Sequence, residues 1–157
     1  LQQFATPGKE DEKIASEMLE RMGIRSLKDE IYTEISGGER QLVLIARALA
    51  QQTDYILMDE PTSNLDYGNQ MRMLQTIREL TKEQIGVCFT SHYPEHAFLT
   101  DASVLAIEGR EQSEKGSAEE IVTEDLLKRM YGLDTEIQQI KDSREKIQKS
   151  ILVHMQT

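Results

Sequence analysis

The chain has 157 residues, with 18 lysines and arginines against 28 aspartates and glutamates, so its formal net charge is −10. This length fits one domain or part of one. An acidic chain lacks the clustered positive charge that neutralises phosphates, which excludes a nucleic-acid partner. The single cysteine, Cys88, excludes an internal disulfide and indicates a reducing, cytoplasmic setting. The apolar run 42–50 contains Arg47 and is too short to span a bilayer.

The first ninety residues predict helices that give way to strands. After a linker over 1–9, apolar spacing predicts a helix over 10–22 that ends at Gly23, then a short helix from residue 24 capped by Ser26. The next elements are a helix over 39–51, a strand over 55–58, a helix over 69–82 and a strand over 85–90. Strand, helix and strand in succession over 55–90 indicate an α/β layer with a parallel sheet. The side chains expected in its core are Met71, Leu74, Ile77, Leu80 and Cys88.

The remaining residues predict shorter elements. A hairpin is expected from strands 103–107 and 111–115 around Gly109. Ser117 and Glu120 have the spacing of a capping box, and Thr123 begins a helix that ends near Gly132. Two more strands are expected near 135–140 and 150–155.

The segment Ser36-Gly37-Gly38 stands directly before the helix predicted over 39–51. Adjacent glycines let a ligand come close to the backbone, and the first amides of a helix point outward with the positive end of its dipole. Together with the Ser36 hydroxyl, this arrangement suits a phosphate. The alternative is a serine N-cap followed by a glycine turn.

Two carboxylates, Asp59 and Glu60, follow the apolar strand 55–58. The carboxyl end of such a strand opens into the crevice where α/β sheets bind ligands. Asp59 is suited to hold Mg²⁺, which prefers oxygen ligands, and Glu60 is placed to orient or deprotonate an attacking water. The alternative is that both acids are solvated or paired with Arg47.

Two further polar segments follow the strands, Pro61–Asp66 and Ser91-His92. His92 is expected at the same sheet edge as Asp59 and Glu60, where it could contact a terminal phosphate. The alternative for His92 is a structural or solvated histidine, which is also the interpretation for His96 and His154.

In this order and spacing, the four segments resemble the motifs of the ATP-binding-cassette (ABC) ATPases. Residues 35–41 are similar to the signature loop, 55–60 to the Walker B strand, 63–66 to the D-loop and His92 to the switch histidine. The resemblance covers about residues 1–132. Residues 59–66 are similar to the transporter branch, and residues 119–132 to the importers of iron chelates, haem and cobalamin.

The resemblance implies part of the ABC ATPase fold. Residues 1–35 would belong to the helical subdomain, 36–132 to the signature helix and the C-terminal part of the RecA-like parallel-sheet core, and 133–157 to a C-terminal extension. The phosphate-binding Walker A pattern Gly-x-x-x-x-Gly-Lys-Ser/Thr is missing from the 157 residues, where only Gly8 precedes a lysine and Glu10 comes next.

The resemblance also implies roles for single residues. Two subunits of the family face each other across two ATP molecules, so Ser36, Gly37, Gly38 and Glu39 would bind the partner's ATP. Asp59 would hold Mg²⁺, while Glu60 and His92 would act on the water and the γ-phosphate. Ser63 would bind nucleotide, and Asp66 would act across the dimer.

The function implied is that of an ATP-hydrolysing importer subunit. Its partners would be a second nucleotide-binding subunit and a membrane permease, and it would lie at the inner face of the cell membrane without inserting into it. The 157 residues alone, without Walker A, are expected to be inactive. The alternatives are a non-transport ABC ATPase of chromosome maintenance or translation, and a non-catalytic fragment.

Overall fold

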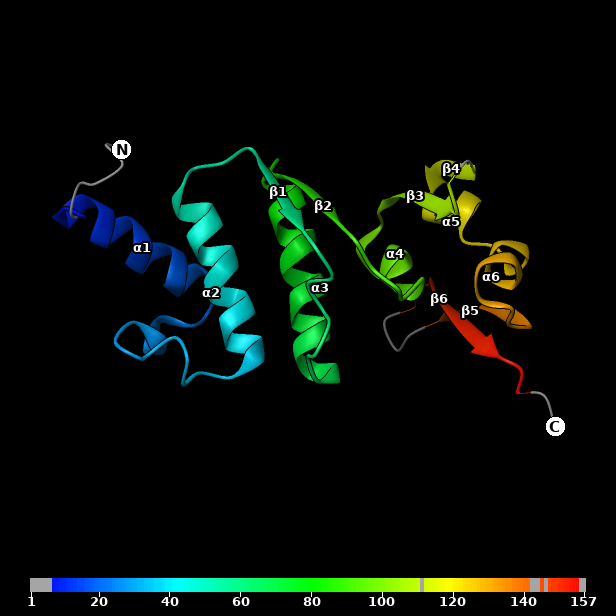
Figure 1. Cartoon of the computed structure of the whole chain (residues 1–157), viewed down its shortest axis with the longest axis horizontal. Helices are drawn as coiled ribbons and strands as arrows, with labels where there is room; N and C mark the ends of the chain where they lie inside the picture. The colour runs from blue at the N-terminus through cyan, green and yellow to red at the C-terminus, as the bar shows by residue number, and fades with distance from the viewer. Residues whose placement is uncertain (1–6, 111, 142–144, 146, 156–157) are drawn as a thin grey trace. The chain divides into compact units, whose positions relative to one another are not determined.

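The computed structural model describes residues 7–110, 112–141, 145 and 147–155 and divides the chain into two compact units, 1–90 and 91–157 (Figure 1). Most of the predicted linker 1–9 and the first residue of the strand predicted over 111–115 lie outside the described residues. The predicted domain boundaries after residues 35 and 132 stay a prediction.

The first unit begins with helix α1 (Lys9–Arg21), which confirms the predicted helix and packs against α2 (Gly37–Ala50) (Figure 1). After α1, Gly23 has a φ of +69°, a left-handed conformation that glycine adopts without strain. The short helix expected from residue 24 is wrong: the chain forms one 3-10 turn, η1 (Arg25–Leu27), without a Ser26 cap. Only Ile24 is buried there, so the segment lacks the apolar face that stabilises a longer helix.

Helix α3 (Tyr67–Lys82) begins two residues before the predicted start because Asp66 caps it. Its buried stripe consists of Met73, Leu74, Ile77 and Leu80. The expectation that Met71 points inward is corrected, since Met71 is only half-buried. Met73 is the buried methionine instead, because it lies one turn before Ile77 on the same helix face.

Strands β1 (Tyr55–Met58) and β2 (Gly86–Phe89) pair in parallel, as predicted, with Leu57 opposite Cys88. Ile56 is buried, whereas Tyr55 and Leu57 are 77% and 83% exposed. Cys88 is exposed too, so its expected place in the core is wrong. Side chains alternate across a strand, and the register puts Cys88 on the open face with Leu57.

The second unit begins with α4 (Glu95–Thr100), a helix that the sequence did not predict because six residues are too few for a periodic pattern. The predicted hairpin is confirmed as β3 (Ser103–Glu108) and β4 (Gln112–Ser117). The predicted caps are confirmed at α5 (Ala118–Ile121) and α6 (Glu124–Tyr131). A small core of Ala106, Ile121 and Leu126 joins this hairpin to both helices.

The unit ends in a second hairpin of β5 (Thr135–Lys141) and β6 (Ile147–Val153), which confirms strands in the tail and starts the last one three residues before the prediction. In both units the described part of the chain has no helix that is long and apolar enough to cross a membrane.

Candidate functional site

The predicted phosphate loop begins helix α2. The Ser36 hydroxyl accepts the Glu39 amide hydrogen at 3.3 Å, and the Glu39 carboxylate accepts the Ser36 amide hydrogen at 2.9 Å. Hydrogen bonds to the Glu39 carboxylate from the Ser36 side chain, and to a smaller extent from the Ser36 amide, lower the pKa of this carboxyl. The serine N-cap is therefore present. The first-turn amides of Gly37 and Gly38 have no partner within the helix.

The two glycines differ in their surroundings. A Cβ atom on Gly37 would meet only the Asn64 carbonyl oxygen, at 4.0 Å, whereas one on Gly38 would lie 3.1 Å from Asn69 Nδ2. Gly37 is exposed, and Gly38 is buried against the first turn of α3. The open backbone at this helix start is therefore that of Gly37.

Asp66 lies close to this loop through Asn69. Its carboxylate caps α3 by accepting the Asn69 amide hydrogen at 3.0 Å and a hydrogen from Asn69 Nδ2 at 2.6 Å. The bond from the Asn69 backbone is the main cause that lowers the pKa of Asp66. The structure thus brings together Gly38 and Asp66, two of the predicted site residues, with Asn69 between them.

A second group of predicted residues lies where β1 and β2 end. Thr90 Oγ1 donates to Asp59 Oδ1 at 2.6 Å and accepts the Glu60 amide hydrogen at 2.9 Å. The Glu60 carbonyl accepts from the Ser63 amide at 3.0 Å and from its hydroxyl at 2.9 Å. This turn therefore uses the Ser63 hydroxyl, which was predicted to bind nucleotide.

At this edge of the sheet, the Asp59 carboxylate can serve as one protein ligand of Mg²⁺. Asp59 is exposed, and its Oδ1 accepts a hydrogen bond from the Thr90 hydroxyl. No group of three or more possible metal-ligating acids, histidines or cysteines occurs among the residues with described positions. Mg²⁺ commonly takes one or two carboxylates, and phosphates and waters complete its shell.

His92 is exposed and belongs to the second unit. Its carbonyl accepts from the Tyr131 hydroxyl at 3.4 Å. Beside it, the Ser91 hydroxyl lies 2.8 Å from Nδ1 of the buried His96. The predicted meeting of His92 with Asp59 and Glu60 stays a prediction, whereas the structural interpretation of His96 agrees with its burial.

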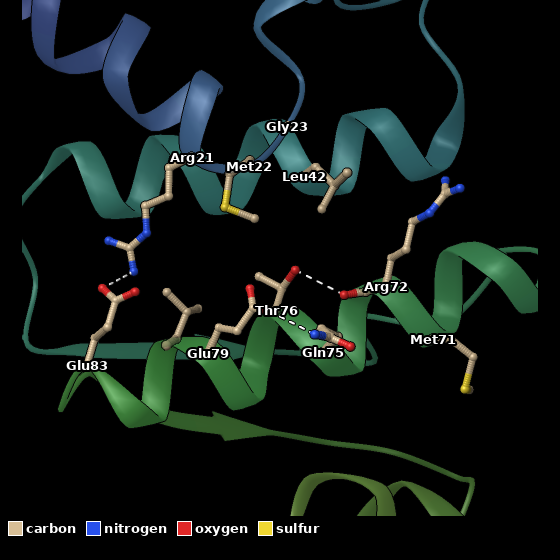
Figure 2. A pocket seen from close by; sticks show the side chains of 11 residues that line it. Arg21, Met22, Gly23, Leu42, Met71, Arg72, Gln75, Thr76, Glu79 and Glu83 are labelled. Carbon is tan, nitrogen blue, oxygen red and sulfur yellow. Dashed lines mark hydrogen bonds and ion pairs between the residues drawn. The ribbon is translucent and has the colours of Figure 1, made fainter. Parts of the chain in front are cut away.

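A pocket lies elsewhere in the first unit. It has a volume of about 450 Å³ between the end of α1, the middle of α2 and α3 (Figure 2). Several of its polar side chains are bonded to one another: Arg21 forms an ion pair with Glu83, and the Gln75 amide donates to Glu79 at 2.9 Å (Figure 2). None of the predicted site residues lines this pocket.

Sequence reasoning missed two residues of the site, Thr90 and Asn69. Both have a recognisable sequence signal. Thr90 is the last residue of the strand predicted over 85–90, and Asn69 is three residues after Asp66, the spacing of a helix N-cap and its N3 residue.

Comparison with known proteins gives a consistent result. The family model described as "ABC transporter" matches residues 2–63. An uncharacterised ABC transporter ATP-binding protein of Haemophilus influenzae is 36% identical over 87% of the chain and 52% of its own length. The iron(3+)-hydroxamate import ATP-binding protein of Bacillus subtilis is 36% identical over 85% of the chain and 50% of its own length. The chain thus spans about half the length of these curated relatives.

Solved structures match as well. A metal-chelate type ABC transporter in an inward-facing conformation superposes with a TM-score of 0.90 at 29% identity, over 99% of this chain and 62% of that one. A dimeric post-hydrolysis state of an ATP-binding cassette with ADP and Pi superposes with a TM-score of 0.59 at 28% identity, over 72% and 50% of the two chains. The predicted fold class is confirmed by these matches.

Proposed function

Since the chain belongs to the ABC ATPases, we propose that it contributes the signature loop and the Walker B carboxylates of the ATP-binding subunit of an importer. The observation that carries the proposal is the pair of groups in the first unit: the α2 start at Gly37 and the carboxylates where β1 ends. Relatives named for iron(3+)-hydroxamate and ferric enterobactin import support the importer branch.

The α2 start would serve the ATP held by a second subunit. The Gly37 amide, the Ser36 hydroxyl and the helix dipole offer donors and positive potential to a phosphate. The Glu39 carboxylate would keep the loop in this shape through its bond to the Ser36 amide. Asp66 would act across the dimer from the neighbouring turn.

The carboxylates would serve the ATP of the subunit itself. Asp59 would be a ligand of Mg²⁺, which, when bound, neutralises phosphate charge and orients the triphosphate. Glu60 would orient or deprotonate the attacking water, and His92 would contact the γ-phosphate. These residues act mainly by positioning and charge, as phosphoryl transfer requires.

The proposed setting is the inner face of the cell membrane, where a permease would carry the subunit. Closure of the nucleotide-bound dimer would reach the permease as a rigid-body motion of the segment over 1–35. A P-loop supplied by residues outside these 157 would complete the site.

The decisive experiment replaces Glu60 by glutamine in a subunit that also carries a P-loop. We expect E60Q to lower ATP turnover by about 10²-fold or more, the scale of a lost general base, while ATP binding persists. E17Q is the matched control, because Glu17 is an exposed glutamate on α1. Steady-state phosphate release and nucleotide binding by calorimetry provide both readouts. Turnover of E60Q close to that of E17Q would contradict the proposed role.

A further inference from the structure

One hydroxyl connects the two acids at the end of β1. Thr90 directly follows β2, where its amide donates to the Met58 carbonyl at 3.1 Å and continues the parallel ladder by one residue. Its hydroxyl reaches across to Asp59 Oδ1 at 2.6 Å and to the Glu60 amide nitrogen at 2.9 Å. Thr90 is thus hydrogen-bonded to both residues of the proposed Walker B pair.

The direction of these two bonds follows from their chemistry. A backbone N–H can only donate, so the Thr90 oxygen accepts from Glu60 and its single hydrogen remains for the Asp59 carboxylate. A hydrogen bond to an ionised carboxylate is stronger than one between neutral groups. The hydroxyl therefore orients the Asp59 side chain and, through the same oxygen, the peptide that begins Glu60.

The backbone of Glu60 needs such support. Its φ is +43°, in the left-handed region that residues other than glycine seldom occupy. Ser63 holds the carbonyl of Glu60 with its amide and its hydroxyl, and Thr90 holds the amide nitrogen. An unfavourable backbone conformation persists when the surrounding structure holds it in place. In this turn, the backbone N–H and C=O of Glu60 are both hydrogen-bonded.

We infer that Thr90 is a positioning residue for ATP hydrolysis: its hydroxyl holds Asp59 in the orientation for Mg²⁺ and fixes the turn that presents Glu60 to the water. This inference rests on the proposed function. Serine at position 90 keeps the hydroxyl, whereas valine has nearly the same shape without it.

The test compares T90V and T90S in the P-loop-containing subunit. The matched control is T53V, because the Thr53 hydroxyl also bonds a neighbouring N–H and C=O, those of Tyr55, at the opposite end of β1. We expect T90V to lower kcat by about tenfold or more, as loss of a hydrogen bond to a charged group does, with the KM for ATP changed less than about threefold. T90S and T53V should keep kcat within about threefold of the parent.

A second measurement needs no turnover. Hydrogen exchange of the Glu60 amide, followed by NMR in the nucleotide-free subunit, should be about tenfold faster in T90V, because this amide loses its acceptor. It should be unchanged in T90S and T53V. Thermal unfolding of each variant identifies any that is not folded, and T90S retains the packing of the site.

Several results would overturn the inference. The first is that T90V hydrolyses ATP at the parent rate while E60Q is inactive. The second is that the kcat of T90S or of T53V is as low as that of T90V. The third is that hydrogen exchange of the Glu60 amide is unchanged in T90V. The first of these leaves the proposed function intact. Undiminished turnover in E60Q would instead overturn the proposed function, and the inference would fall with it.

Discussion

The two glycines at the start of α2 predict opposite responses to the same substitution. Gly37 has space for a Cβ atom, whereas a Cβ on Gly38 would lie 3.1 and 3.2 Å from Asn69 Nδ2 and Cγ. Asn69 cannot move away freely, because its side chain and its amide are both hydrogen-bonded to Asp66. The cost of a side chain at position 38 is therefore set by the capping of α3.

We expect G37A to raise the free energy of unfolding by up to about 1 kcal/mol, because alanine loses less backbone entropy than glycine in a helix. G38A should be less stable than G37A by about 1 kcal/mol or more, since it must displace Asn69. Urea titrations of the two variants and the parent measure both values. Equal stability of G37A and G38A would show that Asn69 yields without cost.

His96 predicts a pH dependence of stability. It is 4% exposed, and burial lowers the pKa of its imidazole, an effect that the nearby Glu95 carboxylate partly opposes. Below about pH 6.5, the unfolded chain takes up a proton that the folded unit resists. Stability should therefore fall as the pH decreases from about 7 and should not change with this group above that range.

The H96N variant tests this dependence, with H154N as control because His154 is exposed. Urea titrations between pH 5 and 8 should show a smaller loss of stability toward acid in H96N than in H154N. Four carboxyl groups have a lowered pKa and stabilise the fold until they are protonated at more acidic pH: Glu39, Asp66, Glu108 and Glu120. A slope over pH 5–7 that is unchanged in H96N would contradict the assignment.

At the scale of elements, Arg129 links α6 to the β3–β4 hairpin. Its guanidinium donates two bonds of 2.9 Å to Glu108 and one of 2.6 Å to Glu114, and it forms an ion pair with Asp125 one turn earlier. These bonds, led by the one to Glu108, raise the pKa of Arg129, and they lower that of the Glu108 carboxyl. One fork-shaped cation thus compensates three carboxylates.

We expect R129M to lower the urea midpoint of the second unit, because three acids then repel one another without a cation. R129K should lie between R129M and the parent, since an ammonium cannot make the paired bonds of a guanidinium. The difference between R129M and the parent should shrink in about 1 M salt, where exposed charges are screened. An R129M midpoint equal to that of the parent would show that packing alone holds the hairpin.

At the scale of the whole molecule, the open face of the β1–β2 pair affects how these 157 residues behave alone. Tyr55 and Leu57 are more than three-quarters exposed there, beside the exposed Cys88. An uncovered apolar strand face favours association between copies. The sequence also contains no P-loop to bind the β- and γ-phosphates.

We therefore expect the 157 residues alone to self-associate and to neither bind nor hydrolyse Mg-ATP measurably. Calorimetry and phosphate release test the second point. For the first, sedimentation should show less association for L57T than for I31T, a control that removes an exposed apolar side chain outside the β1–β2 pair. Micromolar Mg-ATP binding with steady turnover would show that other residues build the phosphate site.

The sequence by itself determined those features that depend on neighbours along the chain. The caps at Ser36, Ser117 and Thr123 and the glycine stops at Gly23 and Gly132 occur where their spacing predicts them. The order of the motifs determined the family. Caps, turns and helical periodicity arise from interactions within a few residues, so a linear pattern carries them.

Only the tertiary structure decided what depends on residues far apart in sequence. The pairing of β1 with β2 turned Cys88 outward beside Leu57 and brought the Thr90 hydroxyl to Asp59 and Glu60, thirty-one and thirty positions earlier in the chain. The approach of α3 to α2 placed Asn69 against Gly38. Strand register and helix packing choose these neighbours, and a one-residue change of register would place each side chain on the other face.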